Sequence, residues 1–299
     1  MTQSIYQQIT ETIIGHLLTV TPQSWERPWH NGHSSLPVNA ATRRAYKGIN
    51  ILTLWAAATR SGYTDQRWAT YRQWSELGAQ VRKGEWGNPC IFYKPTGDNS
   101  DRPSSSPENP TATDRPRFVL RVSTLFNVAQ VDGAPEPWLA PEPPSNLPAC
   151  STFETFVAAT GAIVLHGGDT ACYVPATDQI CIPARQSFQT LPGYTATLSH
   201  ELIHWTGAKH RLARDLSGRF GSVSYAAEEL VAELGAAFVL AGLGLASEPP
   251  TQHAAYIINW LPLVKSDPRV LFVTATHASR AADWLQELVS IKRPSHSLP

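Results

Sequence analysis

The sequence predicts an α+β protein of two domains: an N-terminal α+β domain and a mostly helical C-terminal domain with a small sheet. Three observations lead to this fold class. Helical and strand-like patterns are mixed in the first part of the chain, a Pro-rich stretch follows, and helical periodicity dominates the rest. We place the first domain at 1–132, a linker at 133–149 and the second domain at 150–299.

The N-terminal domain is expected to contain two helices and two main strands, with short mixed elements between them. The helices are predicted at 4–20 and 49–60, and the strands at 90–95 and 117–131. The first helix ends before Pro22 and the second at the Ser61-Gly62 pair. The segment 95–116 is dense in Pro, Ser, Asn and Asp and lacks apolar periodicity, so we expect a mobile loop there.

The C-terminal domain is expected to begin with a helix and three short strands and then to become helical. The first helix is predicted at 151–160, the strands at 162–166, 171–174 and 179–182, and the later helices at 194–206, 223–242, 251–263 and 268–291. Pro262 and Pro268 separate the last two helices, because proline interrupts the helical hydrogen-bond pattern.

Composition narrows the class of protein. The chain is 42% hydrophobic and 16% charged, as globular proteins are, and its longest apolar runs are far shorter than a membrane span. The first residues lack a basic start and include Glu11, which argues against a secretory signal. The four cysteines form no CxxC pair and are expected to be reduced thiols. We therefore expect a cytoplasmic protein with no membrane partner.

Charge is distributed unevenly along the chain. Residues 1–132 hold 14 Lys/Arg against 10 Asp/Glu, whereas residues 133–299 hold 10 against 14. The predicted loop lowers the first balance, since it contributes 2 basic and 4 acidic residues. A basic half joined to an acidic half indicates an anionic partner for the first.

A metal-binding pattern begins at His200. The sequence HELIH puts His200 and His204 on one side of a helix, four residues apart, so both imidazoles can reach one ion. Glu201 follows the first histidine and can hold a metal-bound water as a general base. The spacing therefore predicts a divalent metal site with Glu201 as its catalytic residue. Zinc is the expected ion, and manganese or cobalt are alternatives because the same ligand types accept them.

Two residues compete to be the third ligand. His210 completes HExxHxxGxxH, the metzincin pattern, but that family needs a methionine turn and the only methionine here is Met1. The rival is YAAEELVAEL, where Glu229 and Glu233 share one face of a second helix, as in His₂Glu peptidases of the gluzincin type. We assign Glu229 as the third ligand and Glu233 as an outer hydrogen-bond partner of a ligand histidine. Glu228 points elsewhere on that helix and is the weaker alternative.

A group that stabilises the oxyanion of a peptidase intermediate is also expected. The sequence leaves four candidates open: Tyr225, His210, His253 and His277.

Basic and aromatic residues alternate in the N-terminal half, in RRAYKGIN, RWATYRQW, VRKGEW and FYK, and six of the ten tryptophans fall within 1–132. Bases stack on aromatic rings while Lys and Arg bind phosphates, so this mixture is typical of a surface for single-stranded nucleic acid. The competing explanation is that the aromatic residues form the core.

The motifs together resemble the ArdC-type antirestriction proteins carried on conjugative plasmids. YKGIN, RWATYRQWSELGAQVRKGEWG and LFNVAQ are similar to the N-terminal domain of that family, and HELIHWTGAKHRLARD, YAAEELVAELGAAF and HAAYIINWL to its metallopeptidase-like domain. The resemblance implies single-stranded DNA binding, a zincin-like domain and protection of incoming plasmid DNA from restriction endonucleases. The DNA contacts map onto Arg43, Arg44, Tyr46, Lys47, Asn50, Trp55, Trp68, Arg72, Trp74, Arg82, Lys83 and Trp86.

Other functions remain open from the sequence. The acidic half could act on a nearby protein such as a restriction enzyme, or the metal could be structural in a protein that only binds DNA. A DNA-dependent protease that clears crosslinked or DNA-bound proteins is a further hypothesis, as is an ordinary cytosolic peptidase whose aromatic N-terminal half is merely structural.

Overall fold

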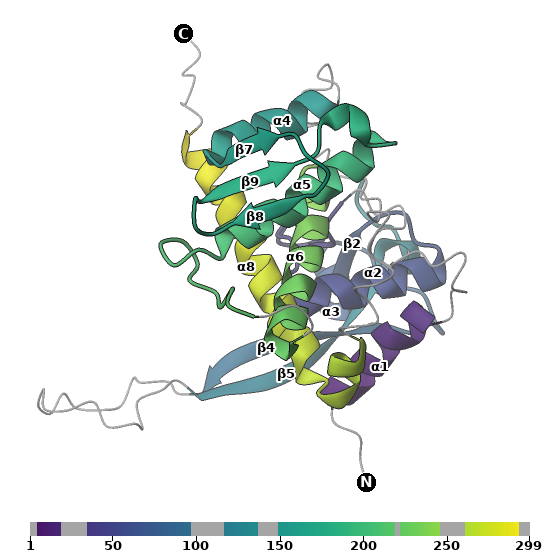
Figure 1. Ribbon diagram of the computed structural model, residues 1–299. Coiled ribbons are helices and arrows are strands. Elements are labelled where there is room, and N and C mark those ends of the chain that lie inside the picture. The colour runs from purple at the N-terminus through teal and green to yellow at the C-terminus, as the bar shows by residue number, and fades with distance from the viewer. Residues whose placement is uncertain are drawn as a thin grey trace, which may run out of the picture.

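The computed structural model describes residues 5–18, 35–96, 117–136, 149–218, 222–245 and 261–292. It has the two-part α+β architecture that the sequence predicts, with small sheets in both halves (Figure 1). Within the described ranges, no helix is both long enough and apolar enough to cross a membrane.

The N-terminal half is built on a four-stranded sheet in the order β1-β2-β5-β4. Its strands are β1 (Val38–Asn39), β2 (Arg67–Thr70), β5 (Arg117–Asn127) and β4 (Asn88–Thr96). Only β1 and β2 are parallel, and β4 and β5 extend from the body as a long antiparallel arm (Figure 1). A second, two-stranded sheet pairs β3 (Gln80–Val81) with β6 (Val131–Asp132).

The described residues of this half also form three helices and a 3₁₀ turn: α1 (Ile5–Leu18), α2 (Ile49–Ser61), α3 (Tyr71–Glu76) and η2 (Val128–Gln130). The end of α2 is fixed by Gly62, whose φ of 67° lies in the left-handed region that glycine adopts without strain. A capping box between Thr70 and Gln73 starts α3 directly after β2. These local signals position α2 and α3 beside the sheet.

The C-terminal half begins with α4 (Ala149–Thr160) and a three-stranded sheet in the order β7-β9-β8. Its strands are β7 (Ile163–His166), β8 (Cys172–Val174) and β9 (Gln179–Ile182), followed by the 3₁₀ turn η3 (Arg185–Ser187). The helices α5 (Leu191–Thr206), α6 (Val223–Gly242) and α8 (Arg269–Lys292) follow, and residues 261–266 are also helical.

The helices α5 and α6 pack at close range. Gly235 of α6 faces Ile203 of α5, and a Cβ atom at Gly235 would lie 2.8 Å from the Ile203 side chain. Side-chain caps fix where each helix begins, since Thr190 accepts a hydrogen bond from the Gly193 amide and Ser222 accepts one from the Tyr225 amide. The caps therefore fix where each helix begins, and the absence of a side chain at Gly235 allows the two helices to approach closely.

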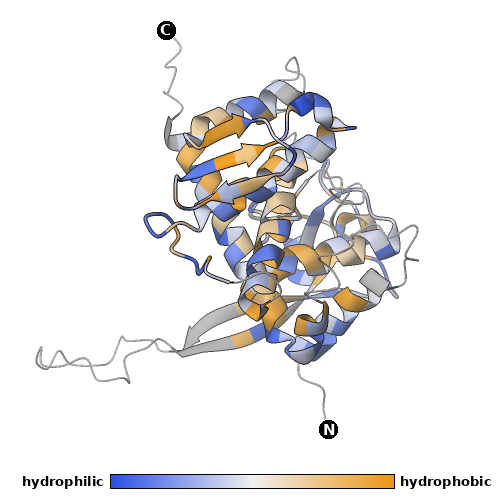
Figure 2. Ribbon diagram, in the orientation of Figure 1, coloured by the Kyte–Doolittle hydropathy of each residue, from blue (hydrophilic) through white to orange (hydrophobic). Residues whose placement is uncertain are grey.

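The two halves share one hydrophobic core. Ile49, Ile51, Leu52, Trp55 and Ile91 belong to the same buried cluster as the apolar faces of α5, α6 and α8. The ring of Tyr6 in α1 lies 4.7 Å from that of Phe272 in α8, and Thr10 donates a hydrogen bond to the carbonyl of Pro268. Hydropathy colouring shows orange segments where the helices of the two halves meet (Figure 2). The halves are thus packed together and do not hang from a linker alone.

Most expected elements are present with small shifts in their bounds. The helix at 223–242 agrees with the sequence, whereas the strand expected at 117–131 ends at Asn127, because η2 and β6 follow it. Parts of four expectations lie outside the described residues: 4, 19 and 20 of the first helix, 97–116 of the loop, 137–148 of the linker and 251–260 of one later helix.

Candidate functional site

A cavity of about 300 Å³ opens between α5, α6 and the edge strand β8. It brings together parts of the chain that are distant in sequence. Its lining residues are Ala171, Cys172, Tyr173, Pro175, His200, Glu201, His204, Asp215, Leu216, Gly218, Ser224, Tyr225, Glu228 and Glu229. The cavity is therefore where the HELIH segment meets the carboxylates of the second helix.

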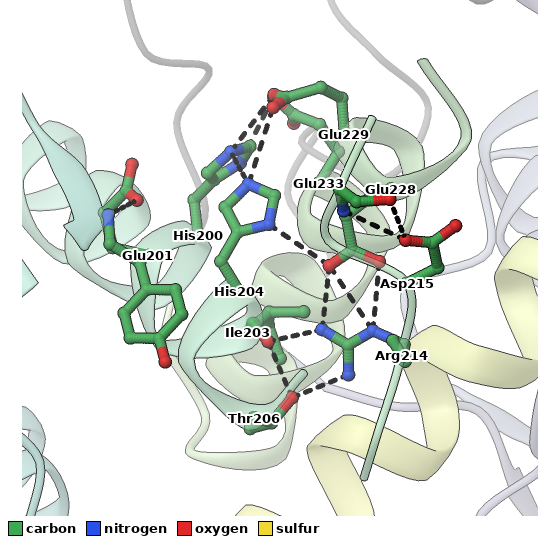
Figure 3. Close-up of polar contacts among 12 residues, drawn as sticks. His200, Glu201, Ile203, His204, Thr206, Arg214, Asp215, Glu228, Glu229 and Glu233 are labelled. Atoms are coloured by element: carbon green, nitrogen blue, oxygen red, sulfur yellow. Dashed lines mark hydrogen bonds and ion pairs between the residues drawn. The ribbon is translucent and has the colours of Figure 1, made fainter. Parts of the chain in front are cut away.

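The two histidines of α5 face the same point. They lie one turn apart, and the Nε2 atoms of His200 and His204 are 3.1 Å from each other. Both side chains are largely buried, with exposed fractions of 10% and 14%. The helical spacing that the sequence suggested thus produces a converging pair of imidazoles (Figure 3).

Glu229 joins this pair from α6. Its Oε2 atom lies 3.4 Å from Nε2 of His200, and its Oε1 atom lies 3.6 Å from Nε2 of His204. The donor atoms of all three residues lie within 4.8 Å of one another. Two neutral imidazoles and a carboxylate are a ligand set that divalent transition metals accept, with a position left for water. The three side chains therefore fit a metal ion, whereas His210 lies elsewhere.

Outside this cluster, each histidine has a carboxylate at its second ring nitrogen. Glu233 Oε1 lies 3.7 Å from Nδ1 of His200, close to where the sequence places an outer partner. Glu228 Oε1 lies 3.1 Å from Nδ1 of His204, so the expectation that Glu228 points away from the site is wrong. Glu228 and Glu229 are adjacent in the sequence, but the ring of His204 lies between their carboxylates. Glu229 faces the ring nitrogen inside the cluster, and Glu228 faces the one outside it (Figure 3).

Arg214 holds Glu228 in place. Its guanidinium makes hydrogen bonds of 2.9 Å and 3.0 Å to the two Glu228 oxygens and donates further to Thr206 Oγ1 and the Ile203 carbonyl. The side chain of Arg214 is only 5% exposed. A buried guanidinium that donates to this many acceptors is held in one orientation. Arg214 therefore fixes the Glu228 carboxylate, which in turn orients His204. The sequence analysis missed Arg214; the available signals were its place after the HELIH helix and the second acidic residue beside Glu229.

The protonation of the cluster follows from these contacts. Burial alone would lower the pKa of His204, but hydrogen bonds to Glu228 and Glu229 raise the pKa to about 10. Burial would also lower the pKa of His200, but the bond to Glu229 and the charges of Glu201 and Glu233 together raise it. Burial would raise the pKa of Glu229, yet both histidines lower it. In the absence of a metal, the carboxylates thus favour protonated imidazoles.

Glu201 lies beside the histidines without joining the cluster. Its Oε2 atom accepts a 2.8 Å hydrogen bond from the backbone amide of Tyr173 in β8, and its side chain borders the cavity. Tyr173 is itself held, because its hydroxyl donates to Asp178 and accepts from Arg211. Arg211 also pairs with Asp178. The edge strand thereby fixes the carboxylate that the sequence names as the general base.

The four oxyanion candidates occupy different places. Tyr225 lines the cavity. His210 is 65% exposed and contacts Arg211 and Asp178. His277 lies on α8 and does not line the cavity, and His253 lies outside the described residues. Of the three described candidates, Tyr225 alone borders the cavity.

Five of the residues expected to contact DNA are buried. Their exposed fractions are Tyr46 7%, Asn50 8%, Trp55 1%, Trp68 0% and Trp74 0%. Each one makes structural contacts: Asn50 pairs with the Ile91 backbone, and the indole nitrogens of Trp55 and Trp74 donate to main-chain carbonyls. The expectation that these five contact DNA is wrong, because their side chains are packed in the core.

The other seven expected contacts lie at the surface. Arg43, Arg44, Lys47, Arg72, Arg82, Lys83 and Trp86 are exposed or partly exposed, and Trp86 reaches 88%. Lys47 forms an ion pair of 2.6 Å with Asp283 of α8, so it links the two halves. Arg82 pairs with Glu85 and Asp132.

A second hollow of about 680 Å³ lies in this region. It is lined by Tyr71, Gln80, Val81, Arg82, Lys83, Glu85, Phe126 and Asp132. Tyr71 is 52% exposed and was missed by the sequence analysis, although it lies in the RWATYRQW segment. The hollow combines an exposed ring and two cations with two carboxylates, Glu85 and Asp132, which both pair with Arg82.

Comparisons with known proteins define the class of each half. Residues 151–287 match the family model of a zincin-like metallopeptidase, and residues 3–126 match the N-terminal domain of the anti-restriction factor ArdC. The C-terminal half is therefore a zincin-like metallopeptidase domain joined to an ArdC-type N-terminal domain.

Full-length similarities agree with this class. The crystal structures of the antirestriction protein ArdC from plasmid R388, metal-free and Mn(II)-bound, are 36% identical with TM-scores of 0.77 and cover 97% and 96% of this chain and 99% of their own. An uncharacterized protein, y4eC, of Sinorhizobium fredii is 42% identical over 94% of this chain and 91% of its own length. The DNA primase TraC of Escherichia coli is 38% identical, but the match covers only 20% of that protein. The chain belongs to the ArdC antirestriction family, and the resemblance seen in its motifs is confirmed.

Proposed function

We propose that this chain is an antirestriction protein that binds single-stranded DNA through residues 1–132 and carries a metal-dependent peptidase centre in residues 150–299. It acts in the cytoplasm and protects incoming conjugative plasmid DNA from host restriction endonucleases. The observation that carries the proposal is the convergence of His200, His204 and Glu229 on one point, with Glu201 beside them on the same cavity.

The proposed ligands are His200, His204 and Glu229, and the proposed ion is zinc. The donor set suits zinc but also manganese, the ion named for the Mn(II)-bound relative. When bound, such an ion polarises a carbonyl group and lowers the pKa of a coordinated water. The rest of the chemistry belongs to side chains of the chain itself.

Each proposed role follows from a contact. The Glu228 carboxylate accepts a hydrogen bond from Nδ1 of His204, and Glu233 lies 3.7 Å from Nδ1 of His200, so both carboxylates favour a hydrogen on Nδ1 and leave the Nε2 lone pairs directed at the cluster. Glu201 is proposed as the general base, because the Tyr173 amide orients its carboxylate at the cavity edge. Tyr225 is proposed to stabilise the oxyanion, since it alone of the described candidates lines the cavity.

The DNA-binding surface is proposed from the exposed members of the basic-aromatic segments. Trp86 and Tyr71 present rings to solvent, and Arg82 and Lys83 lie at the hollow that Tyr71 lines. Aromatic rings stack on bases of any sequence, and the cations bind the phosphates between them. The proposed protein substrate is one that meets the same DNA, such as a restriction enzyme.

The test is conjugative transfer of an unmodified plasmid into restricting and non-restricting recipients. Glu201→Gln removes the general base but keeps the size of the side chain and an oxygen that can accept the hydrogen bond from the Tyr173 amide. Its control is Glu287→Gln, an exposed glutamate on α8. If peptidase chemistry is needed, Glu201→Gln loses protection in the restricting recipient while Glu287→Gln keeps it. Full protection by Glu201→Gln would mean that DNA binding alone suffices and would refute the peptidase part.

A further inference from the structure

Two cysteines face each other across the sheet of the C-terminal half. In the antiparallel pair of β8 and β9, Cys172 is the direct register partner of Cys181. Side chains of directly opposite residues lie on the same face of a sheet, with Cβ atoms about 4.5–5.5 Å apart. The pair is therefore a dithiol within one hairpin, which the absence of a CxxC motif conceals.

The thiols lie near enough to influence each other. Burial is the main cause that raises the pKa of the Cys172 thiol, and the neighbouring Cys181 thiol raises it further. A disulfide needs Cβ atoms about 3.5–4.5 Å apart, so a modest approach of the two strands is sufficient. The raised pKa reduces the thiolate fraction and makes the pair a slow reactant at neutral pH.

The pair is also accessible. Cys172 is exposed and Cys181 is partly buried, whereas Cys90 in the N-terminal half is buried. On the other side of β9, Leu165 of β7 is the register partner of Cys181 and is 47% exposed. This row of side chains is therefore open to solvent at Cys172 and Leu165, where a small disulfide reagent can reach it.

We propose that Cys172 and Cys181 form a reversible disulfide that joins the edge strand β8 to β9 beside the cavity. The oxidant is a small-molecule disulfide. One cysteine thiolate attacks it, giving a mixed disulfide and one released thiol, and the second cysteine attacks the protein sulfur of that mixed disulfide and releases the second thiol. The two cysteines lose two protons and two electrons, and the small disulfide gains both.

The bond would act next to the proposed catalytic glutamate. Cys172 lines the same cavity as Glu201, and the next residue, Tyr173, donates the amide hydrogen that holds the Glu201 carboxylate. Strand β8 is at the sheet edge and pairs only with β9 in this sheet. A crosslink therefore restrains the wall of the cavity. An effect on peptidase activity rests on the function proposed above, but formation of the bond does not.

The experiment uses the full-length protein, treated overnight with excess oxidised glutathione at mildly alkaline pH. Free thiols are then blocked, and the protein is digested with trypsin and Asp-N. Cleavage before Asp169 and Asp178 and after Arg185 separates the cysteines into DTACYVPAT and DQICIPAR, with Cys150 in another peptide. We expect these two peptides to be linked, with a mass lower by two hydrogens, and to separate on reduction.

Single serine variants provide the matched controls. Cys181→Ser should leave Cys172 as a stable glutathione adduct, and Cys172→Ser should abolish the linked peptide without changing the fold. Hydrogen exchange gives a second measurement, because amides of residues 172–174 should exchange more slowly in the oxidised wild-type protein than in the reduced one. A glutathione adduct on Cys172 in the wild-type protein, without the internal link, would overturn the proposal, as would a link from Cys172 to Cys150 or to a second chain.

Discussion

Glu228 contacts His204 through the ring nitrogen that faces away from the cluster, at 3.1 Å, while the adjacent Glu229 contacts the nitrogen that faces it, at 3.6 Å. One histidine is therefore held between two consecutive glutamates of α6. Arg214 fixes the outer one. This contact chain runs from Arg214 through Glu228 to His204 and makes the position of the imidazole depend on a residue outside the cavity lining.

The first prediction concerns the contacts that run from Arg214 through Glu228 to His204. Glu228→Gln keeps a hydrogen-bonding side chain but removes the charge that favours an Nδ1–H imidazole. We expect the affinity for Zn²⁺ or Mn²⁺ to fall by about 10–100-fold, the usual effect of losing an outer carboxylate. Titration against a chelator of known affinity measures it. Glu287→Gln is the control, and an unchanged affinity for Glu228→Gln would show that the outer carboxylate does not orient the ligand.

The second prediction separates the two possible third ligands. Glu229→Ala should yield purified protein without a stoichiometric metal by elemental analysis, because two imidazoles alone hold the ion weakly. His210→Ala should retain it, since His210 contacts Arg211 and Asp178 and lies outside the cluster. The reverse pattern would restore the three-histidine assignment that the sequence motif suggests.

The third prediction is a pH dependence of metal binding. The metal-free protein holds His204 protonated, with a pKa raised to about 10, and a ligand imidazole must be neutral. Binding therefore releases protons at neutral pH, and the metal affinity should rise as pH rises from 6 to 8, by about tenfold per pH unit for each proton released. Calorimetry in buffers with different ionisation enthalpies counts these protons. A binding constant that does not change over this range would contradict the raised pKa.

The same shift affects the metal-free fold. A raised folded-state pKa means that protonation of His204 contributes stability that is complete below its ordinary value of 6.5 and is lost as pH rises toward about 10. The metal-free protein in EDTA should therefore melt at progressively lower temperature across that range. His204→Gln should flatten this alkaline decline.

The fourth prediction distinguishes surface from core tryptophans. Trp86→Ala should weaken single-stranded DNA binding by about 1–3 kcal/mol, the value of one stacked base, and leave the melting temperature nearly unchanged because the ring is 88% exposed. Trp68→Ala should instead cost about 3–5 kcal/mol of folding stability, since its ring is fully buried. Chemical denaturation and fluorescence anisotropy with a labelled oligonucleotide measure the two effects. Equal DNA affinity for Trp86→Ala and wild type would exclude this surface.

The fifth prediction concerns phosphate contacts. Arg44 and Lys83 are exposed, and neither forms an ion pair within the part of the chain that the structure describes. Replacing both with alanine should flatten the plot of log affinity against log salt by about 0.7 per lost contact. Lys265→Ala, an exposed change in the C-terminal half, is the control and should leave the slope as it is. A slope unchanged by the double variant would count against these contacts.

Local patterns in the sequence predicted much of the candidate metal site. The spacing of His200 and His204 depends only on helical periodicity, and Glu229 follows from a strong second helix with acidic residues on one face. The role of Glu228 could not be derived in this way. Its contact with His204 depends on how far α6 is rotated and how closely it approaches α5, which the packing of Gly235 on Ile203 determines.

The N-terminal half was harder to predict for a related reason. Interleaved basic and aromatic residues suit a nucleic-acid surface, but an alternating pattern also places every second residue of a strand inside. Trp68 and Arg67 are consecutive in β2, yet both are buried, with Arg67 bound to Asp65 and to the carbonyl of Pro135. Sheet order and the cover provided by α2 decide exposure, and neither can be read from composition.

The shared core of the two halves has a geometric consequence. Because Ile49, Leu52 and Trp55 pack in the same cluster as α6 and α8, and Gly48 donates a hydrogen bond to Ser279, the cavity cannot swing freely relative to the N-terminal half. On the proposed function, the cavity would reach only a protein bound to the same strand close to the N-terminal half. Lengthening the chain between the halves would not extend that reach. The fixed packing of the two halves would then set how far along the strand the cavity can act.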